Sequence, residues 1–373
     1  MQKQLYLFSA IFVSCCVISS EAIAQDTIER RPYSERGFVG APYIRYLPET
    51  EWIGGLVGIY YYHIGPDTND WLTRPSNFSA GASYSQLHQS TFGIDYDLYA
   101  PGNAYHSYGW LRYQQFPLDY YGIGDYVPSG SIDAYTPLYR GIGFYLMKNI
   151  FHNKYYESVY AGLEGEFRYD AVLQSDSAGP IASGQVPGAR GGTSNGLGAI
   201  VTYDTRDNTY ATHSGQYASV DGEFYGHALG SDYSFSRFTA DLRKFYPLSE
   251  DQTLAFQWYS VISNGTAPFY LLRGLGGSSL LRGYYLLRFR DNDVTLLQSE
   301  WRFPIWWRFG ADVFAGAGEV GHTLSNFGIG GIHPSVGLGL RLLVIPEEHL
   351  TARVDYGFGT DSQEIYFTIL EAF

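Results

Sequence analysis

The stretch "YYESVYAGLEGEFRYD", residues 155–170, alternates along most of its length between apolar and charged side chains. Leu163 and Phe167 stand on one parity, whereas Glu164 and Glu166 stand on the other. Successive side chains of a β-strand point to opposite faces, so the pattern predicts a strand with one apolar and one charged face. A strand between membrane lipid and a wet barrel lumen requires that division. A soluble β-sandwich gives the same alternation with its apolar face turned inward, so this strand alone leaves both architectures open.

The same period of two predicts sixteen strands, the first at Ala41–Leu47 and the last at Gln363–Phe373. Several exceed ten residues, close to the ~9 to 11 residues of a tilted membrane strand and longer than the ~5 to 6 typical of globular sheets. Aromatic residues gather at turns, as in "RFPIWWRF" (302–309), where an interfacial girdle is expected. The fold predicted is therefore all-β, a 16-stranded antiparallel transmembrane β-barrel over residues 41–373.

The first 24 residues have the layout of a secretory signal peptide, with Lys3, the apolar run Leu5–Ser19 and a small-x-small site at the end. One alternative is an N-terminal transmembrane helix, but the apolar run is shorter than the ~20 residues of a membrane span. The other alternative is a lipoprotein acylated at Cys15 or Cys16. Both cysteines lie here, so the exported chain would have no disulfide and no thiolate for catalysis or metal binding.

Composition narrows the class further. Aromatic residues make up 17% of the chain, and a net charge of −13 argues against a nucleic-acid partner. The nine histidines lack metal-ligand spacing, so neither a metal site nor a cofactor is predicted. A signal peptide ahead of an aromatic-rich β-chain predicts a bacterial outer-membrane protein in contact with outer-membrane lipids and lipopolysaccharide.

One long segment breaks the alternation: "GGSSLLRGYYLLRFRDND", residues 276–293, with three arginines within nine residues. It falls in a predicted outer loop over residues 264–292. The overlapping "APFYLLRGLGGSSLLRGYY" (267–285) resembles the sixth outer loop of the BamA/TamA superfamily, and "QSEWRFP" (298–304) resembles the strand that follows it. The segments "VTYDTRDNTYATHSG", "RYLPETEWIGG" and "YYGIG" match further motifs of that superfamily, the last two being typical of its bacterial surface antigen branch.

This resemblance implies a loop folded into the lumen, with the tip Arg282, Gly283 and Tyr284. Glu300 has the inward parity of its strand, so Arg282 could reach it. An arginine inside a barrel needs a partner, because loss of one member of a buried ion pair costs ~3 to 5 kcal/mol. Gly283 would allow a tight turn and Tyr284 could pack beside the guanidinium. The alternative is a surface hairpin with solvated arginines.

A second acid is expected on the next strand in that superfamily, but Gly316 occupies its place. Asp312 has the same inward parity and lies four residues away, ~13 Å along a strand. The sequence therefore leaves Glu300 as the main partner of the loop arginine, with the loop held less firmly.

The resemblance further implies translocation or insertion of protein or lipid and no enzymatic activity. Phe367, Ile369 and Phe373 form the expected C-terminal signal for the outer-membrane assembly machinery. Residues 25–40 form a short extension, too short for a periplasmic POTRA domain, which suggests a separate periplasmic partner.

Two other functions remain open. The first is a passive pore or surface-exposed structural antigen on the same scaffold. The second is an enzyme, since His88 and Ser90 resemble the dyad of outer-membrane phospholipase; polar residues at a wet hairpin end are the simpler explanation.

Overall fold

The computed structural model describes residues 36–62, 73–74, 76–126, 132–152, 158–176, 178–208, 211–345 and 350–373. The predicted signal peptide, residues 1–24, lies outside this part of the chain. Within the described residues, no helix has the length and hydropathy needed to cross a membrane.

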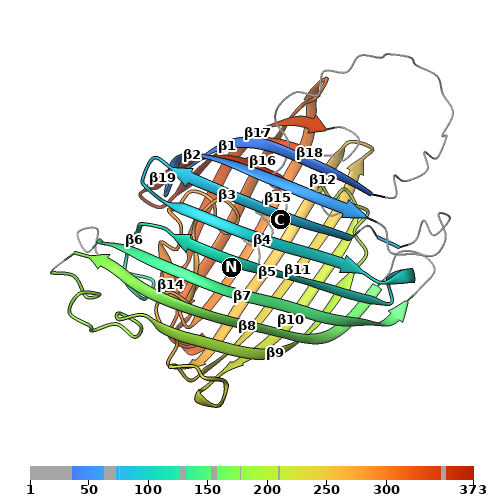
Figure 1. Ribbon diagram of the computed structural model, residues 1–373. Helices are drawn as coiled ribbons and strands as arrows, with labels where there is room; N and C mark the ends of the chain where they lie inside the picture. The colour runs from blue at the N-terminus through green and yellow to red at the C-terminus, as the bar shows by residue number, and fades with distance from the viewer. Residues whose placement is uncertain are drawn as a thin grey trace, which may run out of the picture.

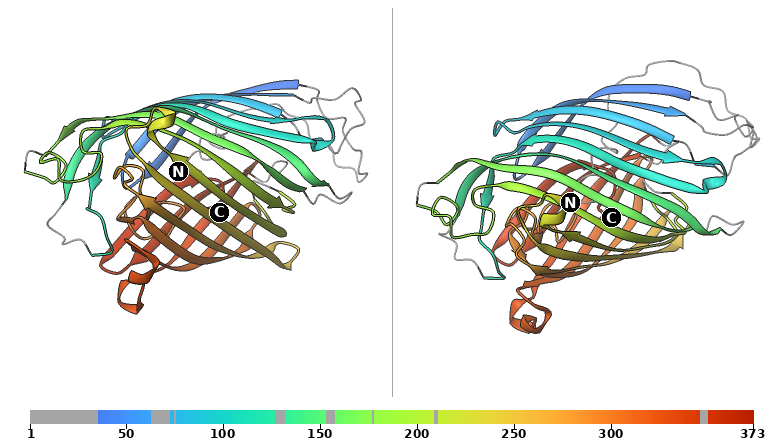
Figure 2. Two further views of the ribbon diagram at one scale, coloured as in Figure 1. Left: turned by 90° about the horizontal axis from the view of Figure 1, so that it is seen from below. Right: turned by 60° about the horizontal axis from the view of Figure 1, so that its bottom comes forward.

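The chain forms an antiparallel barrel of sixteen strand positions, in which β5 and the short β6 share one position beside β7. Blue-to-green strands line one side of the barrel and gold-to-red strands the other (Figures 1 and 2). The barrel strands are β1 (Arg36–Leu47), β2 (Glu51–Tyr62), β3 (Ser76–Ser85), β4 (Ser90–Tyr99), β5 (Tyr105–Gln115), β6 (Leu118–Tyr120), β7 (Asp133–His152), β8 (Ser158–Ser175), β9 (Gly192–Asp204), β10 (Gly215–Tyr225), β11 (Phe235–Ser249), β12 (Gln252–Gly265), β15 (Asp293–Trp306), β16 (Phe309–Gly321), β17 (His333–Ile345), β18 (Leu350–Gly359) and β19 (Ser362–Ile369). Short 3₁₀ turns lie at Pro101–Asn103, His227–Leu229, Leu324–Asn326 and Ile329–Gly331.

Exposure along the strands decides between a barrel and a sandwich. In β8, Leu163 is 62% exposed on the outside, whereas the neighbouring Glu164 is 1% exposed on the inside. Leu297 and Glu300 of β15 divide in the same way, at 61% and 0%. Apolar side chains thus cover the outer surface and charged side chains fill the interior, which is the arrangement of a membrane barrel. The sandwich alternative is wrong.

Both ends of the barrel differ from the predicted boundaries. β1 begins at Arg36, so residues 36–40 belong to the barrel and not to the expected extension, because they pair with β2 up to Tyr62. β19 ends at Ile369, where the following residue, Leu370, has a φ of 69° that interrupts the extended backbone. Phe373 therefore lies outside the last strand.

The barrel closes between β1 and β19 at a single register pair, Tyr46 with Phe367. β18 and β19, in contrast, pair along the whole of β19, and β1 pairs with β2 from end to end. The closure, called here the seam, is consequently the contact with the fewest paired residues among the described barrel strands.

Residues 266–292, called here the inner loop, connect β12 to β15 and fold into the lumen. Two short strands, β13 (Arg273–Leu275) and β14 (Phe289–Asp291), pair with each other inside this loop. Most of its residues are buried, including the whole run from Gly274 to Ser279. The expected inward-folded loop is confirmed, and the surface hairpin alternative is wrong.

Candidate functional site

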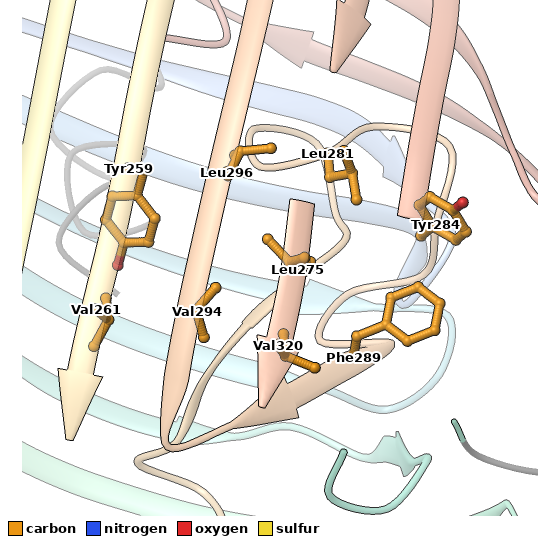
Figure 3. Packing of buried hydrophobic residues seen from close by; sticks show 9 residues of the cluster. All are labelled: Tyr259, Val261, Leu275, Leu281, Tyr284, Phe289, Val294, Leu296 and Val320. Atoms are coloured by element: carbon orange, nitrogen blue, oxygen red, sulfur yellow. The ribbon is translucent and has the colours of Figure 1, made fainter. Parts of the chain in front are cut away.

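Apolar side chains fix the inner loop against the inner face of the barrel (Figure 3). Leu275 and Leu281 from the loop are 0% and 1% exposed, and they pack in one cluster with Val294 and Leu296 of β15. Figure 3 shows Phe289 and Tyr284 side by side on the loop, as further members of this cluster. Complete burial of each such side chain contributes about 1.5 to 3 kcal/mol, so the loop is held by packing as well as by charge.

The Arg282 side chain points from the loop tip into a group of carboxylates. Its Nη2 donates to Glu300 Oε2 of β15, and its Nη1 donates to Asp355 Oδ2 of β18 at 2.7 Å. Asp312 of β16 lies farther away, with its Oδ2 at 3.7 Å from Nη1. The guanidinium also stacks on the Phe314 ring, 3.6 Å from the ring centroid.

Arg282 stays charged in this position. Burial lowers the pKa of its guanidinium, but the neighbouring carboxylates outweigh burial and hold the pKa above its ordinary value. Hydrogen bonds that join a buried arginine to two carboxylates are among the strongest in proteins.

Further arginines surround the same carboxylates, so that four arginines and four carboxylates form one cluster, called here the lock cluster. Its members are Arg282, Arg302, Arg341, Arg353, Glu300, Asp312, Asp355 and Glu371. Arg341 Nη2 lies 2.7 Å from both Glu300 Oε1 and Glu371 Oε2. Equal numbers of opposite charges allow the whole group to be buried without an unpaired ion.

Gly283 brings the loop tip into contact with the barrel wall. Its φ is 112°, a conformation that side chains other than glycine rarely adopt, and a Cβ there would lie 2.8 Å from the carbonyl carbon of Phe358 in β18. Its N–H donates to Tyr366 Oη of β19 at 3.0 Å, and the Tyr366 hydroxyl donates to the Tyr284 carbonyl at 2.9 Å. The tip is thereby bonded to the strand that forms the seam.

Contrary to the expectation, the Tyr284 ring does not pack beside the Arg282 guanidinium. Its hydroxyl donates to the Pro334 carbonyl at 2.8 Å and accepts from the Thr360 N–H at 2.7 Å, which turns the ring toward Phe289. Phe314 provides the aromatic face for Arg282 instead.

Asp355 is the partner that the sequence reasoning missed. The expectation that Glu300 would hold Arg282 nearly alone is incorrect, since the Asp355 carboxylate on β18 accepts hydrogen bonds from both Arg282 and Arg353. Asp355 sits two strands away from the place of Gly316, and a Cβ at the intervening Gly339 would clash with its carboxylate. The signal in the sequence was the run "RVDYG", in which Arg353 and Asp355 share the inward parity.

The predicted C-terminal signal residues have different environments. Phe367 forms the seam pair with Tyr46, and Ile369 is buried at the end of β19. Phe373, beyond the end of β19, turns into the lumen and packs against Phe245. Its main-chain oxygen accepts a 3.0 Å hydrogen bond from Arg302.

His88 and Ser90 lie at the turn between β3 and β4. His88 is exposed and packs edge-on to Tyr84 with the ring centroids 6.3 Å apart. Gln89 between them is buried and bonds to Ser85 and to the Pro117 carbonyl, which gives this segment a structural role at the hairpin end.

The chain matches the Omp85 superfamily domain over residues 70–369. No curated protein sequence matches the chain. Among solved structures it is similar to BamA from Haemophilus ducreyi lacking POTRA domains 1–3, with 14% identity, a TM-score of 0.59, and coverage of 90% of this chain and 70% of that one.

CdiB from Acinetobacter baumannii is similar with 13% identity and a TM-score of 0.60, and the match covers 90% of this chain and 59% of the CdiB chain. CdiB from Escherichia coli gives 14% identity, a TM-score of 0.57, and coverage of 90% and 62%. The chain thus spans about six tenths of the CdiB chains, and at these identities the likeness concerns the fold. The match over residues 70–369, together with the lumen-folded loop, shows that this outer-membrane barrel belongs to the Omp85 superfamily.

Proposed function

We propose that this barrel inserts or translocates protein or lipid at the bacterial outer membrane, and that the inner loop controls when the barrel can open. The observation that carries the proposal is the position of the loop tip, which is bonded to β15 and β18 through Arg282 and to β19 through Gly283. A purely passive pore would not need its longest loop fixed across the lumen by buried ion pairs.

The tip is coupled to the seam through adjacent residues. Tyr366 holds the loop tip, and the next residue, Phe367, forms the only register pair between β19 and β1 in the described structure. Movement of the loop away from Tyr366 therefore removes a support of β19 next to its register pair with β1. Opening of the lumen and loosening of the seam would then occur together.

The proposal includes the cellular setting. Export through a cleaved signal peptide over residues 1–24 and residence in the outer membrane fit the outward apolar surface and the superfamily. The client and any periplasmic partner would be found among proteins that co-purify with the native barrel.

Planar-bilayer conductance of the purified protein tests the control function. The parent should show low conductance with rare openings, and Arg282→Ala should show frequent, larger openings because the tip loses its hydrogen bonds to Glu300 and Asp355. Arg112→Ala is the matched control, since Arg112 of β5 is a lumen arginine that pairs with Asp95 of β4, away from the inner loop's anchors. A steady open pore in the parent that is unchanged by Arg282→Ala would refute loop control and favour the passive pore.

Insertion of a client β-barrel into liposomes tests the activity itself. Liposomes with the parent protein should accelerate formation of the heat-modifiable, folded form of an added client. Equal rates with parent protein and with protein-free liposomes would leave the structural antigen as the better explanation.

A further inference from the structure

A second group of buried charges lies on a different part of the lumen wall, in β8 and β10. Glu164, Asp221 and Glu223 each offer one carboxylate oxygen such that these oxygens lie within 4.8 Å of one another. The three side chains are 1%, 5% and 6% exposed. None of the three belongs to the lock cluster.

Their hydrogen bonding is uneven. Glu223 Oε2 accepts from Arg237 Nη2 at 2.5 Å and its Oε1 accepts from the Tyr225 hydroxyl at 3.1 Å. Neither oxygen of Glu164 has a hydrogen-bond partner in the described part of the structure. A carboxylate buried without a donor costs several kcal/mol, so something must compensate Glu164.

The space around Glu164 is kept open by a glycine. Gly198 on β9 lies between the two acidic strands, and a Cβ there would come within 2.8 Å of Glu164 Oε1. The absence of that Cβ lets the Glu164 carboxylate reach across β9 toward Asp221 and Glu223 of β10. The unpartnered carboxylate is thus aimed at the other two.

The charge balance around this group is also incomplete. The carboxylates of Glu164, Asp221 and Glu223, with the adjoining Glu166 and Asp170, face the guanidinium groups of Arg168, Arg237 and Arg273. Five acids and three bases leave two negative charges, whereas the lock cluster is balanced. A bound divalent cation would neutralise this excess.

We propose that Glu164, Asp221 and Glu223 form a binding site for a hard divalent cation, Ca²⁺ in preference to Mg²⁺, in the barrel wall. Ca²⁺ takes carboxylate oxygens at about 2.3 to 2.6 Å. Two oxygens bound to one such ion lie at most about 5 Å apart, and the three oxygens of this group, all within 4.8 Å of one another, meet that condition. Mg²⁺ requires shorter distances and a stricter octahedron and is usually held by one or two carboxylates with several waters, whereas a group of three carboxylates suits the larger and more flexible shell of Ca²⁺. The site is independent of the function proposed above.

The test uses purified barrel folded in detergent without lipopolysaccharide, which itself binds divalent cations. The thermal midpoint of the heat-modifiable form is measured in EDTA and across a CaCl₂ titration. A cation that binds only the folded barrel raises the midpoint in a saturable manner. Tb³⁺ luminescence excited through Tyr225, which contacts Glu223, reports occupancy directly and should be displaced by Ca²⁺ more readily than by Mg²⁺.

Glu164→Gln should weaken the apparent Ca²⁺ affinity at least tenfold, and Asp221→Asn serves as the second variant if the first folds poorly. Asp95→Asn is the matched control: it removes a paired lumen carboxylate elsewhere and should leave the Ca²⁺ response unchanged. A parent midpoint that does not respond to Ca²⁺, together with a Glu164→Gln protein that is more stable in EDTA, would overturn the proposal and show that a proton neutralises Glu164. An equal Ca²⁺ response in parent and Glu164→Gln would overturn it as well.

Discussion

Asp355→Asn offers the sharpest test of how the inner loop is held. The carboxylate lies between two buried arginines, with Arg282 Nη1 at 2.7 Å and Arg353 Nη1 as its other partner, and it is 0% exposed. Asparagine keeps the shape and one acceptor oxygen but removes the charge. The lock cluster would then hold four arginines against three carboxylates.

The magnitude follows from the remaining contacts. Breaking a buried ion pair costs ~3 to 5 kcal/mol, and since Glu300 still holds Arg282, the lower value of about 3 kcal/mol applies. Such a loss shifts the equilibrium between the closed and the released loop roughly a hundredfold toward release. The folded barrel itself should persist, because the strands keep their main-chain hydrogen bonds.

Limited trypsin digestion measures loop release. Arg288 and Arg290 lie in the inner loop, where Arg290 is 1% exposed, so cleavage there requires the loop to leave the lumen. When opening is fast relative to cleavage, the cleavage rate follows the population of the open form, and it should rise by up to roughly a hundredfold in Asp355→Asn. Peptide mapping by mass spectrometry locates the cuts, and Asp95→Asn should behave like the parent at these two arginines. Loop cleavage within threefold of the parent in Asp355→Asn, despite a lower unfolding midpoint, would refute the assignment of Asp355 to the loop anchor.

Three further outcomes are expected. Gly283→Ala should increase trypsin cleavage of the inner loop, because the positive φ at this position and the nearby Phe358 backbone together strain the loop tip by more than about 2 kcal/mol. Cleavage at the parent rate would contradict the close approach of Gly283 to the Phe358 backbone. In the double variant Tyr46→Cys, Phe367→Cys, a disulfide should form across the seam of the folded barrel and suppress client insertion until it is reduced. Unimpaired insertion by the oxidised protein would exclude opening at the seam. Burial raises the pKa of Glu49, in the turn after β1, to about 7. Because the pKa of Glu49 is higher in the folded than in the unfolded state, Glu49 favours folding at low pH, and this contribution is lost as pH rises from about 4.5 through 7. In urea unfolding, the stability gained by Glu49→Gln should therefore be small at pH 4 and largest at pH 8. An equal gain at both pH values would contradict the buried-acid explanation.

The barrel was predictable from the sequence because each strand carries its own signal. Alternation places Leu163 outside and Glu164 inside whatever the neighbouring strands are, so strand number and facing could be read locally. The end of β19 could not be predicted, since "TILEAF" keeps the alternating pattern while the backbone turns at Leu370.

The loop anchor was predictable only in part. Glu300 follows the loop closely and has a clear inward parity, but Asp355 is 73 residues from Arg282 in sequence, and their contact depends on the curvature of the barrel. Parity identifies which residues face the lumen and not which of them meet. The group of Glu164, Asp221 and Glu223 escaped notice for the same reason, because β9 separates the two strands that carry it.

The sequence distances within the lock cluster also set an order of events during folding. Arg282 can meet Glu300 after a closure of 18 residues, but its bond to Asp355 spans 73 residues and that of Gly283 to Tyr366 spans 83. Contacts of long sequence separation form late, because the chain between them must first be ordered. The inner loop can therefore be fully anchored only after β18 and β19 have joined the sheet. Until then Arg282 lacks its bond to Asp355 and Gly283 its bond to Tyr366, so the loop tip gains its last partners only when the final hairpin joins the sheet.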